Sequence, residues 1–340
     1  MGWAEQREAH AVMRRGEMMG FPGRRRNPLI LQGCNIMKVT PTGETLGATV
    51  EGIDLARPLD RADFRTILQA LGRHGVLRFP AQSLDAAQLK AFSARFGSLE
   101  INVAGAYQEP GHPEIMVLSN IVENGRPIGA RDAGQDWHTD MSYSATIAFA
   151  NVLYALKVPR RDGIPLGGTE FANMRAAHRE LPEDLKRRLD GMTVLHDFNK
   201  FWEMMRARPG SWRPPLSPEQ RRQKPPVSHP IFLAHPVTGD RVLYANPGYA
   251  IRINELPEAE SDETLAFLFE HQLQPRFRYL HRWTEGDLLI WDDLLTLHNA
   301  QADYGPDEPR LIKRCQVMAD RIFDPGFLRE SLGETQPAPA

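Results

Sequence analysis

A histidine and an aspartate separated by one residue are the first side chains of this sequence whose types and spacing could do chemistry. They are His138 and Asp140, within the segment DWHTDMS at residues 136–142. If this segment is a β-strand, both side chains point to the same face. An imidazole and a carboxylate on one wall of a pocket supply two of the three protein ligands of the facial triad that holds non-haem Fe(II). The third ligand must then be a second histidine, brought there by the fold.

A second group of polar residues lies near the C-terminal end of the sequence. His298 follows an apolar segment and two aspartates, and Arg310 and Arg314 come after it. A guanidinium is planar, permanently charged and suited to bind a carboxylate through two hydrogen bonds. On a strand, the spacing of these arginines places both on one face, about 13 Å apart at roughly 3.3 Å per residue. Ile312 shares that face, so we expect the face to point inward and the two cations to line one cavity.

These residues and their order resemble the taurine dioxygenase/TfdA family of Fe(II)- and 2-oxoglutarate-dependent dioxygenases. The resemblance covers residues 37–322, and its motifs include KVTP at 38–41, RFG at 95–97, WHTD at 137–140, GGTEF at 167–171, HPVTG at 235–239 and GDL at 286–288. It implies that His138, Asp140 and His298 are the metal ligands and form the catalytic centre. The cofactor is then Fe(II), with 2-oxoglutarate and O₂ as co-substrates.

The resemblance also implies roles for residues outside the metal ligands. Thr169 and Arg310 match the residues that bind the far carboxylate of 2-oxoglutarate in the family, and Arg314 matches a residue that contacts the substrate anion. Each has a plainer alternative: a strand residue for Thr169, a surface ion pair for Arg310 and a structural salt bridge for Arg314. Asn102 and Tyr107 are further candidates for the substrate pocket.

The implied activity couples oxidative decarboxylation of 2-oxoglutarate, to succinate and CO₂, with hydroxylation of a small organic acid. Residues 100–103 read EINV where the taurine enzyme has a histidine, so taurine itself is disfavoured. Phenoxyalkanoates, sulfonates and carboxylates are the expected substrate types. Two alternatives stay open: desaturation or cyclisation at the same centre in a biosynthetic pathway, and an inactive metal-binding relative. Halogenation is disfavoured because a halogenase lacks the carboxylate ligand that Asp140 supplies.

Composition sets the outer bounds on function. The chain has 340 residues, 41% of them hydrophobic and 25% charged, with a formal net charge of −2. A non-specific nucleic-acid binder would show a basic excess, and no segment is long and apolar enough to cross a membrane. The two cysteines, Cys34 and Cys315, lie far apart, which favours a reducing cytoplasm over a disulfide framework. The resemblance leads us to expect a homo-oligomer, either a dimer or a tetramer.

Hydrophobic periodicity and helix caps predict where the elements lie. We expect helices over 61–74, 86–96, 173–181, 182–189 and 258–273, and strands over 76–80, 115–118, 146–158, 242–245, 277–280, 288–291 and 311–318. A loop over 120–135 should form a lid above the site, and 208–226 should be an exposed insertion. Residues 37–325 form a single domain in this interpretation, between a mobile extension (1–36) and a C-terminal tail (326–340). The pattern supports a mixed α+β fold, and the resemblance implies a distorted jelly-roll, or double-stranded β-helix, flanked by helices.

Overall fold

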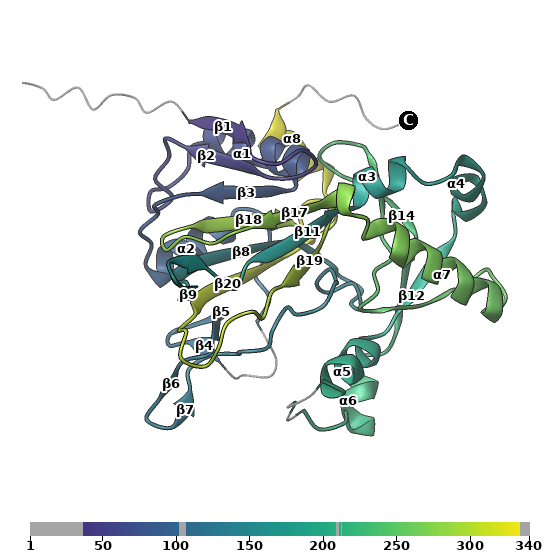
Figure 1. The fold of residues 1–340 in the computed structure, drawn as a ribbon. Helices are drawn as coiled ribbons and strands as arrows, with labels where there is room; N and C mark the ends of the chain where they lie inside the picture. The colour runs from purple at the N-terminus through teal and green to yellow at the C-terminus, as the bar shows by residue number, and fades with distance from the viewer. Residues whose placement is uncertain (1–36, 102–106, 209–210, 212, 334–340) are drawn as a thin grey trace, which may run out of the picture. The chain divides into compact units, whose positions relative to one another are not determined.

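The computed structural model of the protein describes residues 37–101, 107–208, 211 and 213–333. Its largest element is an eight-stranded mixed sheet, here called the major sheet (Figure 1). In spatial order its strands are β1 (Lys38–Pro41), β2 (Ala48–Glu51), β3 (Val76–Phe79), β18 (Leu288–Asp292), β8 (Ala148–Lys157), β20 (Leu311–Met318), β5 (His112–Ser119) and β4 (Gln108–Glu109). The predicted extension 1–36, with Cys34, and the pocket candidate Asn102 fall outside the described residues.

The central strands of the major sheet are buried on both faces. In β8 the first eight residues, from Ala148, are all buried, because helices cover one face and a second sheet covers the other. The covering helices are α1 (Arg61–His74), α2 (Ala86–Ser93) and α8 (Pro325–Leu332). Burial on both faces explains why these strands read as continuous apolar runs in the sequence.

The second sheet, here called the minor sheet, has three antiparallel strands. Their order is β17 (Arg278–His281), β11 (Thr169–Asn173) and β19 (Thr296–Ala300). It packs against the major sheet through one apolar cluster in which Phe171 of β11 meets Trp291 of β18 and Ile312 of β20. The mixed fold with a large sheet and flanking helices is confirmed.

A further set of elements lies beside the two sheets (Figure 1). It contains a three-stranded sheet with the order β13 (Val227–Pro230), β12 (Thr193–His196) and β16 (Ala250–Ile253), packed against α7 (Glu258–Gln272). The shorter elements are α3 (Met174–Arg179), α4 (Glu183–Leu189), α5 (Phe198–Arg206), α6 (Pro218–Gln223), β14 (Phe232–Ala234), β15 (Arg241–Leu243) and the 3₁₀ helix η1 (Pro275–Phe277). The sequence analysis did not predict β12, β13, β16, α5 or α6.

Three boundaries differ from the predicted ones for identifiable reasons. Helix α2 ends at Ser93, not at residue 96, because the chain turns there to hydrogen-bond β20 through Met318 N and Ser98 O at 2.8 Å. The segment 208–226 is not simply an exposed insertion, since Leu216 is buried and Arg213 is paired with Asp132 at 3.0 Å. The predicted tail begins inside α8, whose Leu332 joins the core cluster beside α1.

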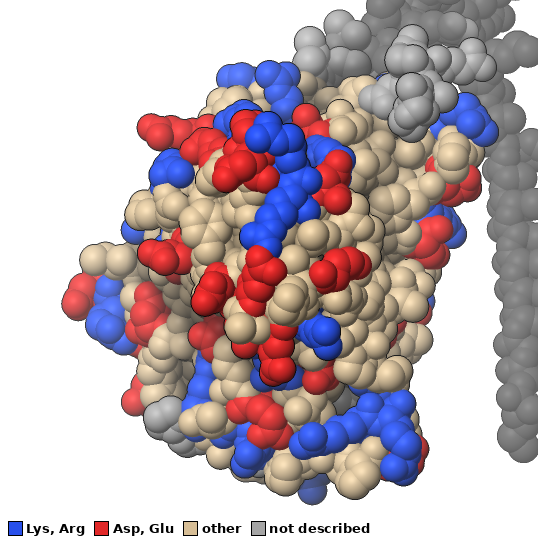
Figure 2. Space-filling view, turned by 90° about the vertical axis from the view of Figure 1, so that its right-hand side faces the viewer, with Lys and Arg blue, Asp and Glu red and all other residues tan. Residues whose placement is uncertain are grey.

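Surface charge, the cysteine and the lengths of the helices can be compared with the expectations drawn from composition. Acidic and basic side chains are interspersed on the face shown in Figure 2. Cys315 is buried and has a free thiol. Among the described residues, no helix is both long and apolar enough to span a membrane. Two small hairpins complete the fold: β6 (Val122–Glu123) with β7 (Arg126–Pro127), and β9 (Arg160–Arg161) with β10 (Ile164–Pro165).

Candidate metal centre

His138 and His298 are brought together by their own backbones. The His138 amide donates to the His298 carbonyl at 3.1 Å, and the His298 amide donates back at 2.8 Å. His298 lies within β19. His138 forms only an isolated β-bridge and is not part of a named strand. The prediction of a strand through His138 and Asp140 is therefore wrong: a turn begins at Asp140, and Met141 has a φ of 57°. The two side chains converge because of this turn.

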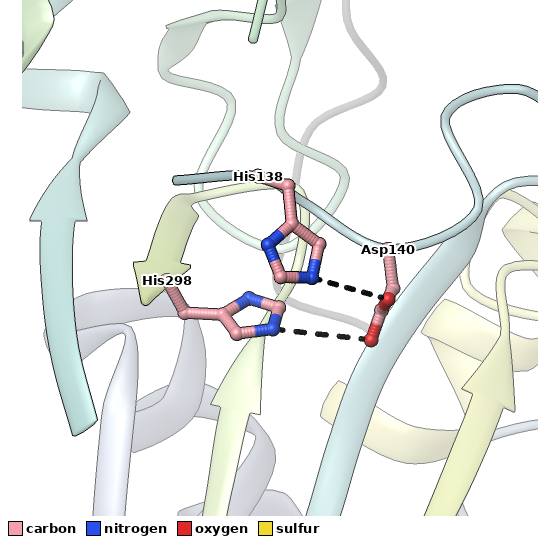
Figure 3. A group of neighbouring side chains, drawn as sticks. All are labelled: His138, Asp140 and His298. Atoms are coloured by element: carbon pink, nitrogen blue, oxygen red, sulfur yellow. Dashed lines mark ion pairs between the residues drawn. The ribbon is translucent and has the colours of Figure 1, made fainter. Parts of the chain in front are cut away.

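Three side chains point toward one another in Figure 3. His138 Nε2 lies 3.6 Å from Asp140 Oδ1, and His298 Nε2 lies 4.0 Å from Asp140 Oδ2. One ligand atom from each residue falls within 4.8 Å of the others, and all three residues are largely buried. Two imidazoles and one carboxylate in this arrangement form a His–Asp–His metal-binding triad, with the donor set of a facial triad.

Hydrogen bonding prepares the two histidines differently. His138 Nδ1 lies 2.7 Å from the carbonyl oxygen of Asp136, so this nitrogen carries the proton and Nε2 keeps its lone pair for a metal. His298 Nδ1 is buried without a hydrogen-bond partner, 3.8 Å from Asp293 Oδ1. Burial and the neighbouring His138 hold the pKa of His298 well below its usual range. The low pKa of His298 favours its neutral imidazole, the form that binds metals.

Asp140 is held in the ionised form. Burial opposes its ionisation, but Arg314 and the two imidazoles outweigh burial and keep the pKa of this carboxyl well below its usual range. Arg314 Nη1 donates to Asp140 Oδ2 at 3.3 Å, and Asn151 Nδ2 donates to the same oxygen at 2.9 Å. These bonds leave Oδ1 as the less engaged oxygen and hold the carboxylate in place.

Asp293 is a buried acid beside the triad that sequence analysis missed. Its carboxylate accepts hydrogen bonds from Asn151 Nδ2 at 2.7 Å and from Trp291 Nε1 at 3.0 Å. Burial and the nearby charge of Asp140 raise the pKa of Asp293 well above its usual range. The amide of Asn151 therefore bonds two carboxyl groups whose pKa values shift in opposite directions, that of Asp140 downward and that of Asp293 upward. The only signal in the sequence was the pair of aspartates before His298.

Thr169 and Arg310 are both buried, Thr169 at the start of β11 and Arg310 directly before β20. The Thr169 hydroxyl accepts a hydrogen bond from Trp283 Nε1 at 3.1 Å, and Thr169 lies two residues before Phe171, the partner of His298 across β11 and β19. Arg310 is only 6% exposed, which excludes the surface ion pair left open by the sequence. Among the described residues no carboxylate lies within 4.0 Å of its guanidinium, whose nearest ring is Tyr304 at 5.9 Å. Burial lowers its pKa, with the Tyr304 hydroxyl opposing the shift.

Arg314 has partners that the sequence did not show. Besides Asp140, its Nη2 contacts the Met116 sulfur at 3.5 Å, while its Nε is buried without a partner. The structural salt bridge is thus present, and substrate binding by Arg314 stays a prediction. Ile312 is buried between the sheets as expected, but Arg310 precedes β20, which begins at residue 311. Tyr107 is half-buried with a φ of 63°, and its pocket role also stays a prediction.

Four aromatic side chains, here called the aromatic layer, extend from the triad. Phe201 of α5 lies 4.9 Å from the His138 ring, and Tyr249 lies 4.9 Å from Phe201. Tyr143 lies 4.8 Å from both Tyr249 and Phe198, the first residue of α5. Because they continue from a ligand, these rings form an apolar wall at the triad. Sequence analysis missed it, since α5 itself was not predicted.

The predicted lid contains a small hairpin, and its far end is tied to the α5–α6 region. The turn between β6 and β7 is exposed, whereas Asp132 and Asp136 are paired with Arg213 and Arg208. A cavity of about 410 Å³ opens here; it is lined by Gln135, Asp136, Arg208, Asn299, Ala300, Gln301, Ala302 and Asp303. Asp136 also holds His138, so this end of the loop positions a ligand.

Comparison with known proteins identifies the family of this chain. The family described as taurine catabolism dioxygenase TauD, TfdA family matches residues 38–316. A pentalenolactone F synthase of Streptomyces avermitilis is 33% identical over 83% of this chain and 94% of that protein. An α-ketoglutarate-dependent 2,4-dichlorophenoxyacetate dioxygenase of Cupriavidus pinatubonensis is 33% identical over 83% of this chain and 98% of that protein.

Solved structures are similar over a comparable length. A taurine dioxygenase from Burkholderia xenovorans superposes with a TM-score of 0.67 at 29% identity, covering 84% of this chain and 91% of that chain. The protein AAD-2, solved in complex with Mn(II) and N-oxalylglycine, superposes with a TM-score of 0.68 at 26% identity, covering 83% and 97%. The similarity therefore includes both sheets and the elements beside them.

Proposed function

The chain belongs to the TauD/TfdA family and is a non-haem iron, 2-oxoglutarate-dependent dioxygenase, and we propose that it hydroxylates a small organic acid. The reaction consumes 2-oxoglutarate and O₂, and releases succinate and CO₂ besides the hydroxylated acid. One observation carries the proposal: His138, Asp140 and His298 offer ligand atoms within 4.8 Å of one another, between two sheets that also bury an arginine without a carboxylate partner.

The residues of the triad fit Fe(II). The pKa of His298 lies well below its usual range and Asp140 is ionised, and the bond from His138 Nδ1 to the Asp136 carbonyl leaves Nε2 directed at the site, so the site offers two nitrogen donors and one anionic oxygen. Bound there, the iron supplies the redox chemistry that activates O₂. The protein's own contribution is to hold the ligands: Asp136 positions His138, while Asn151 and Arg314 hold Asp140.

Arg310 and Thr169 fit the far carboxylate of 2-oxoglutarate. A buried guanidinium is costly unless an anion satisfies it. Since no described carboxylate does so for Arg310, a ligand carboxylate is its natural partner, with the Thr169 hydroxyl as a neighbouring donor. The backbone of Arg310 is fixed by Asn120 Oδ1, which accepts from its amide at 2.8 Å, and by the Ser119 hydroxyl, which donates to its carbonyl at 2.7 Å.

The substrate class follows from the relatives and the aromatic layer. Relatives are named for action on 2,4-dichlorophenoxyacetate, phenoxypropionate and sulfate esters. We propose an acid with an apolar body, bound along the aromatic layer, with Arg314, Asn102 and Tyr107 as predicted contacts. Arg314 retains an unpartnered Nε for this role while Nη1 bonds Asp140.

A second candidate is desaturation or cyclisation in a biosynthetic pathway. The similarity to pentalenolactone F synthase favours it, and the same triad serves both chemistries.

We also propose that the two facing sheets constitute a distorted jelly-roll, that residues 37–325 form a single domain and that the protein assembles as a dimer or tetramer. Sedimentation equilibrium of the purified protein tests the assembly, and a monomer at all concentrations contradicts it.

The test of the function begins without oxygen. Adding 2-oxoglutarate to the Fe(II)-loaded protein should produce a visible charge-transfer band, and admitting air with the right acid should release succinate. We would screen phenoxyalkanoates, alkyl carboxylates and alkyl sulfates, with the Asp140→Ala variant as the control. An inactive relative would bind iron but show neither the band nor succinate. Mass analysis of the product separates addition of one oxygen atom from loss of two hydrogen atoms.

A further inference from the structure

A lysine without an acidic partner lies at the outer end of the aromatic layer. Lys224 Nζ is 5.2 Å from the centroid of the Tyr143 ring and 5.6 Å from that of Phe198. The side chain is half-buried, and no carboxylate of the described residues lies within ion-pair distance of it. Contact with ring faces stabilises an ammonium without neutralising it, so this cation can still bind an anion.

The other cations around the aromatic layer and the triad already have hydrogen-bond partners, including Lys200 of α5, whose Nζ donates to the Ala250 carbonyl at 2.7 Å. Arg314 bonds Asp140, Arg208 is paired with Asp136, and Arg213 with Asp132. Arg310 is buried directly before β20, where 2-oxoglutarate is proposed to bind. Of the described cations for which a contact with the aromatic layer is seen, Lys224 is therefore the one without a hydrogen-bonding or acidic partner for its side chain.

The rings connect Lys224 to the triad. Tyr143 contacts Lys224 on one side and Tyr249 on the other, and Tyr249 contacts Phe201, which lies against His138. An apolar body placed along these rings has a cation at one end and the metal ligands at the other. Such a ligand would bury apolar surface and pair its charge at the same time.

We propose that Lys224 binds the carboxylate of the substrate, and that the apolar body lies along Tyr143, Phe198 and Phe201. The acid then presents to the triad a carbon at the end remote from its carboxylate. This inference rests on the proposed function, and it names the substrate as an aryl or cyclic monocarboxylic acid. Arg314 keeps Asp140 in place in this arrangement.

The experiment measures binding, not turnover. The protein is loaded anaerobically with Fe(II) and 2-oxoglutarate, and phenoxyacetate, 4-phenylbutyrate and cyclohexylacetate are titrated calorimetrically, each beside its neutral amide. The wild type should bind at least one acid more tightly than its amide. Lys224→Met should weaken that acid about ten-fold or more, the order of one charge-assisted contact, and leave the amide unchanged. Lys224→Arg should retain most of the affinity.

Controls separate the lysine's charge from its packing. Lys38→Met removes one exposed positive charge on β1, away from the aromatic layer, and should bind both ligands like the wild type. Equal weakening of acid and amide in Lys224→Met would show that Lys224 only supports the rings, and overturn the proposal. It is also overturned if no acid binds better than its amide. A missing charge-transfer band before titration would instead reject the proposed function.

Discussion

Polar groups are partnered differently in the two regions of the site. Those between the two sheets are buried and hydrogen-bonded to one another, whereas the lysine at the aromatic layer has no acidic partner. Between the sheets, Asp140 and Asp293 are buried, share the amide of Asn151, and each accepts a further hydrogen bond. In the aromatic layer, Phe198 and Phe201 are half-buried and the neighbouring Lys224 has no acidic partner. A buried polar network tolerates little change, because replacing one member leaves another without a hydrogen-bond partner. Substitutions in a half-buried apolar wall cost less stability.

This contrast separates two tasks. We infer that binding of the metal and of 2-oxoglutarate depends on positions fixed by the two packed sheets. We infer that substrate choice depends on the turn after Asp140, on α5 and on the segment before β16, which contribute the rings of the aromatic layer. Relatives of similar identity that are named for different substrates agree with this division. The predictions below test it, beginning with the region between the sheets.

The largest effect is expected from loss of a triad residue. His138→Ala or Asp140→Ala leaves two ligands, which hold Fe(II) too weakly for turnover, so succinate formation should fall to background. The fold should survive, because the two sheets meet through apolar side chains such as Phe171, Trp291 and Ile312. Bound iron, succinate release and far-UV circular dichroism are the measurements. An Asp140→Ala enzyme with full activity would refute the assignment of the triad.

The two arginines should separate by phenotype. Arg310→Ala removes the buried cation proposed to hold 2-oxoglutarate, and truncating one partner of such a pair costs about 2–5 kcal/mol, so 2-oxoglutarate affinity should fall by about thirty-fold to several thousand-fold. Arg314→Ala removes the guanidinium that bonds the ligand Asp140 at 3.3 Å, so iron affinity should fall, but at saturating Fe(II) the affinity for 2-oxoglutarate should stay near that of the wild type. Anaerobic titration of each Fe(II)-loaded variant with 2-oxoglutarate, followed by the charge-transfer band, measures the two affinities. Equal loss of 2-oxoglutarate binding in both would contradict the division of roles.

A smaller effect tests how closely the two regions meet. Gly248 adjoins both the triad and the aromatic layer, and a methyl group there would lie 2.8 Å from His138 Cβ and 3.2 Å from Phe201. Gly248→Ala should therefore displace the ring of His138 and weaken iron binding about ten-fold, an order typical of a small shift in a site that needs precise geometry. The matched control is Gly305→Ala, where a Cβ would meet only the Glu308 carboxylate at 3.7 Å, an ordinary van der Waals contact. Iron titration compares the two variants, and equal affinities would show that the contact is relieved without moving the ligand.

The weakest effect concerns stability and pH. Burial and the neighbouring His229 and Lys200 lower the pKa of His196 to about 3, and burial with Arg78 lowers that of His281 to about 3. The unfolded chain binds these protons near pH 6.5, so the free energy of unfolding should fall as pH drops from about 6.5 toward about 3. One such histidine costs roughly 2 kcal/mol between pH 7 and 5.

Replacement of one histidine at a time locates this loss. His196→Gln removes the titrating group from β12, beside the aromatic layer, and His281→Gln removes it from the minor sheet. Urea unfolding of the metal-free protein at pH 7 and pH 5 should show a smaller loss of stability in each variant than in the wild type. An unchanged loss in both variants would assign the acid sensitivity to other groups.

The sequence by itself predicted much of the major sheet, and its resemblance to a known family predicted which residues carry the chemistry. The spacing of His138 and Asp140 is a weak metal signal alone, and His298 was selected through the resemblance. Helix α1 is readable from its ends: Asp60 caps it, accepting from the Asp63 amide, and Gly75 ends it with a φ of 69°. Strands β8 and β18 are apolar runs, since both their faces are covered, whereas β20 also contains Lys313, Arg314 and Gln316.

Only the tertiary structure decided how these residues meet. The pairing of His138 with His298, the turn at Asp140 and the bridge of Asn151 between two carboxylates join segments distant in sequence, and no local pattern encodes them. The aromatic layer was invisible for the same reason, because its rings come from the turn after Asp140, α5 and the segment before β16. Local propensities specify elements, whereas a site made from several elements depends on their packing.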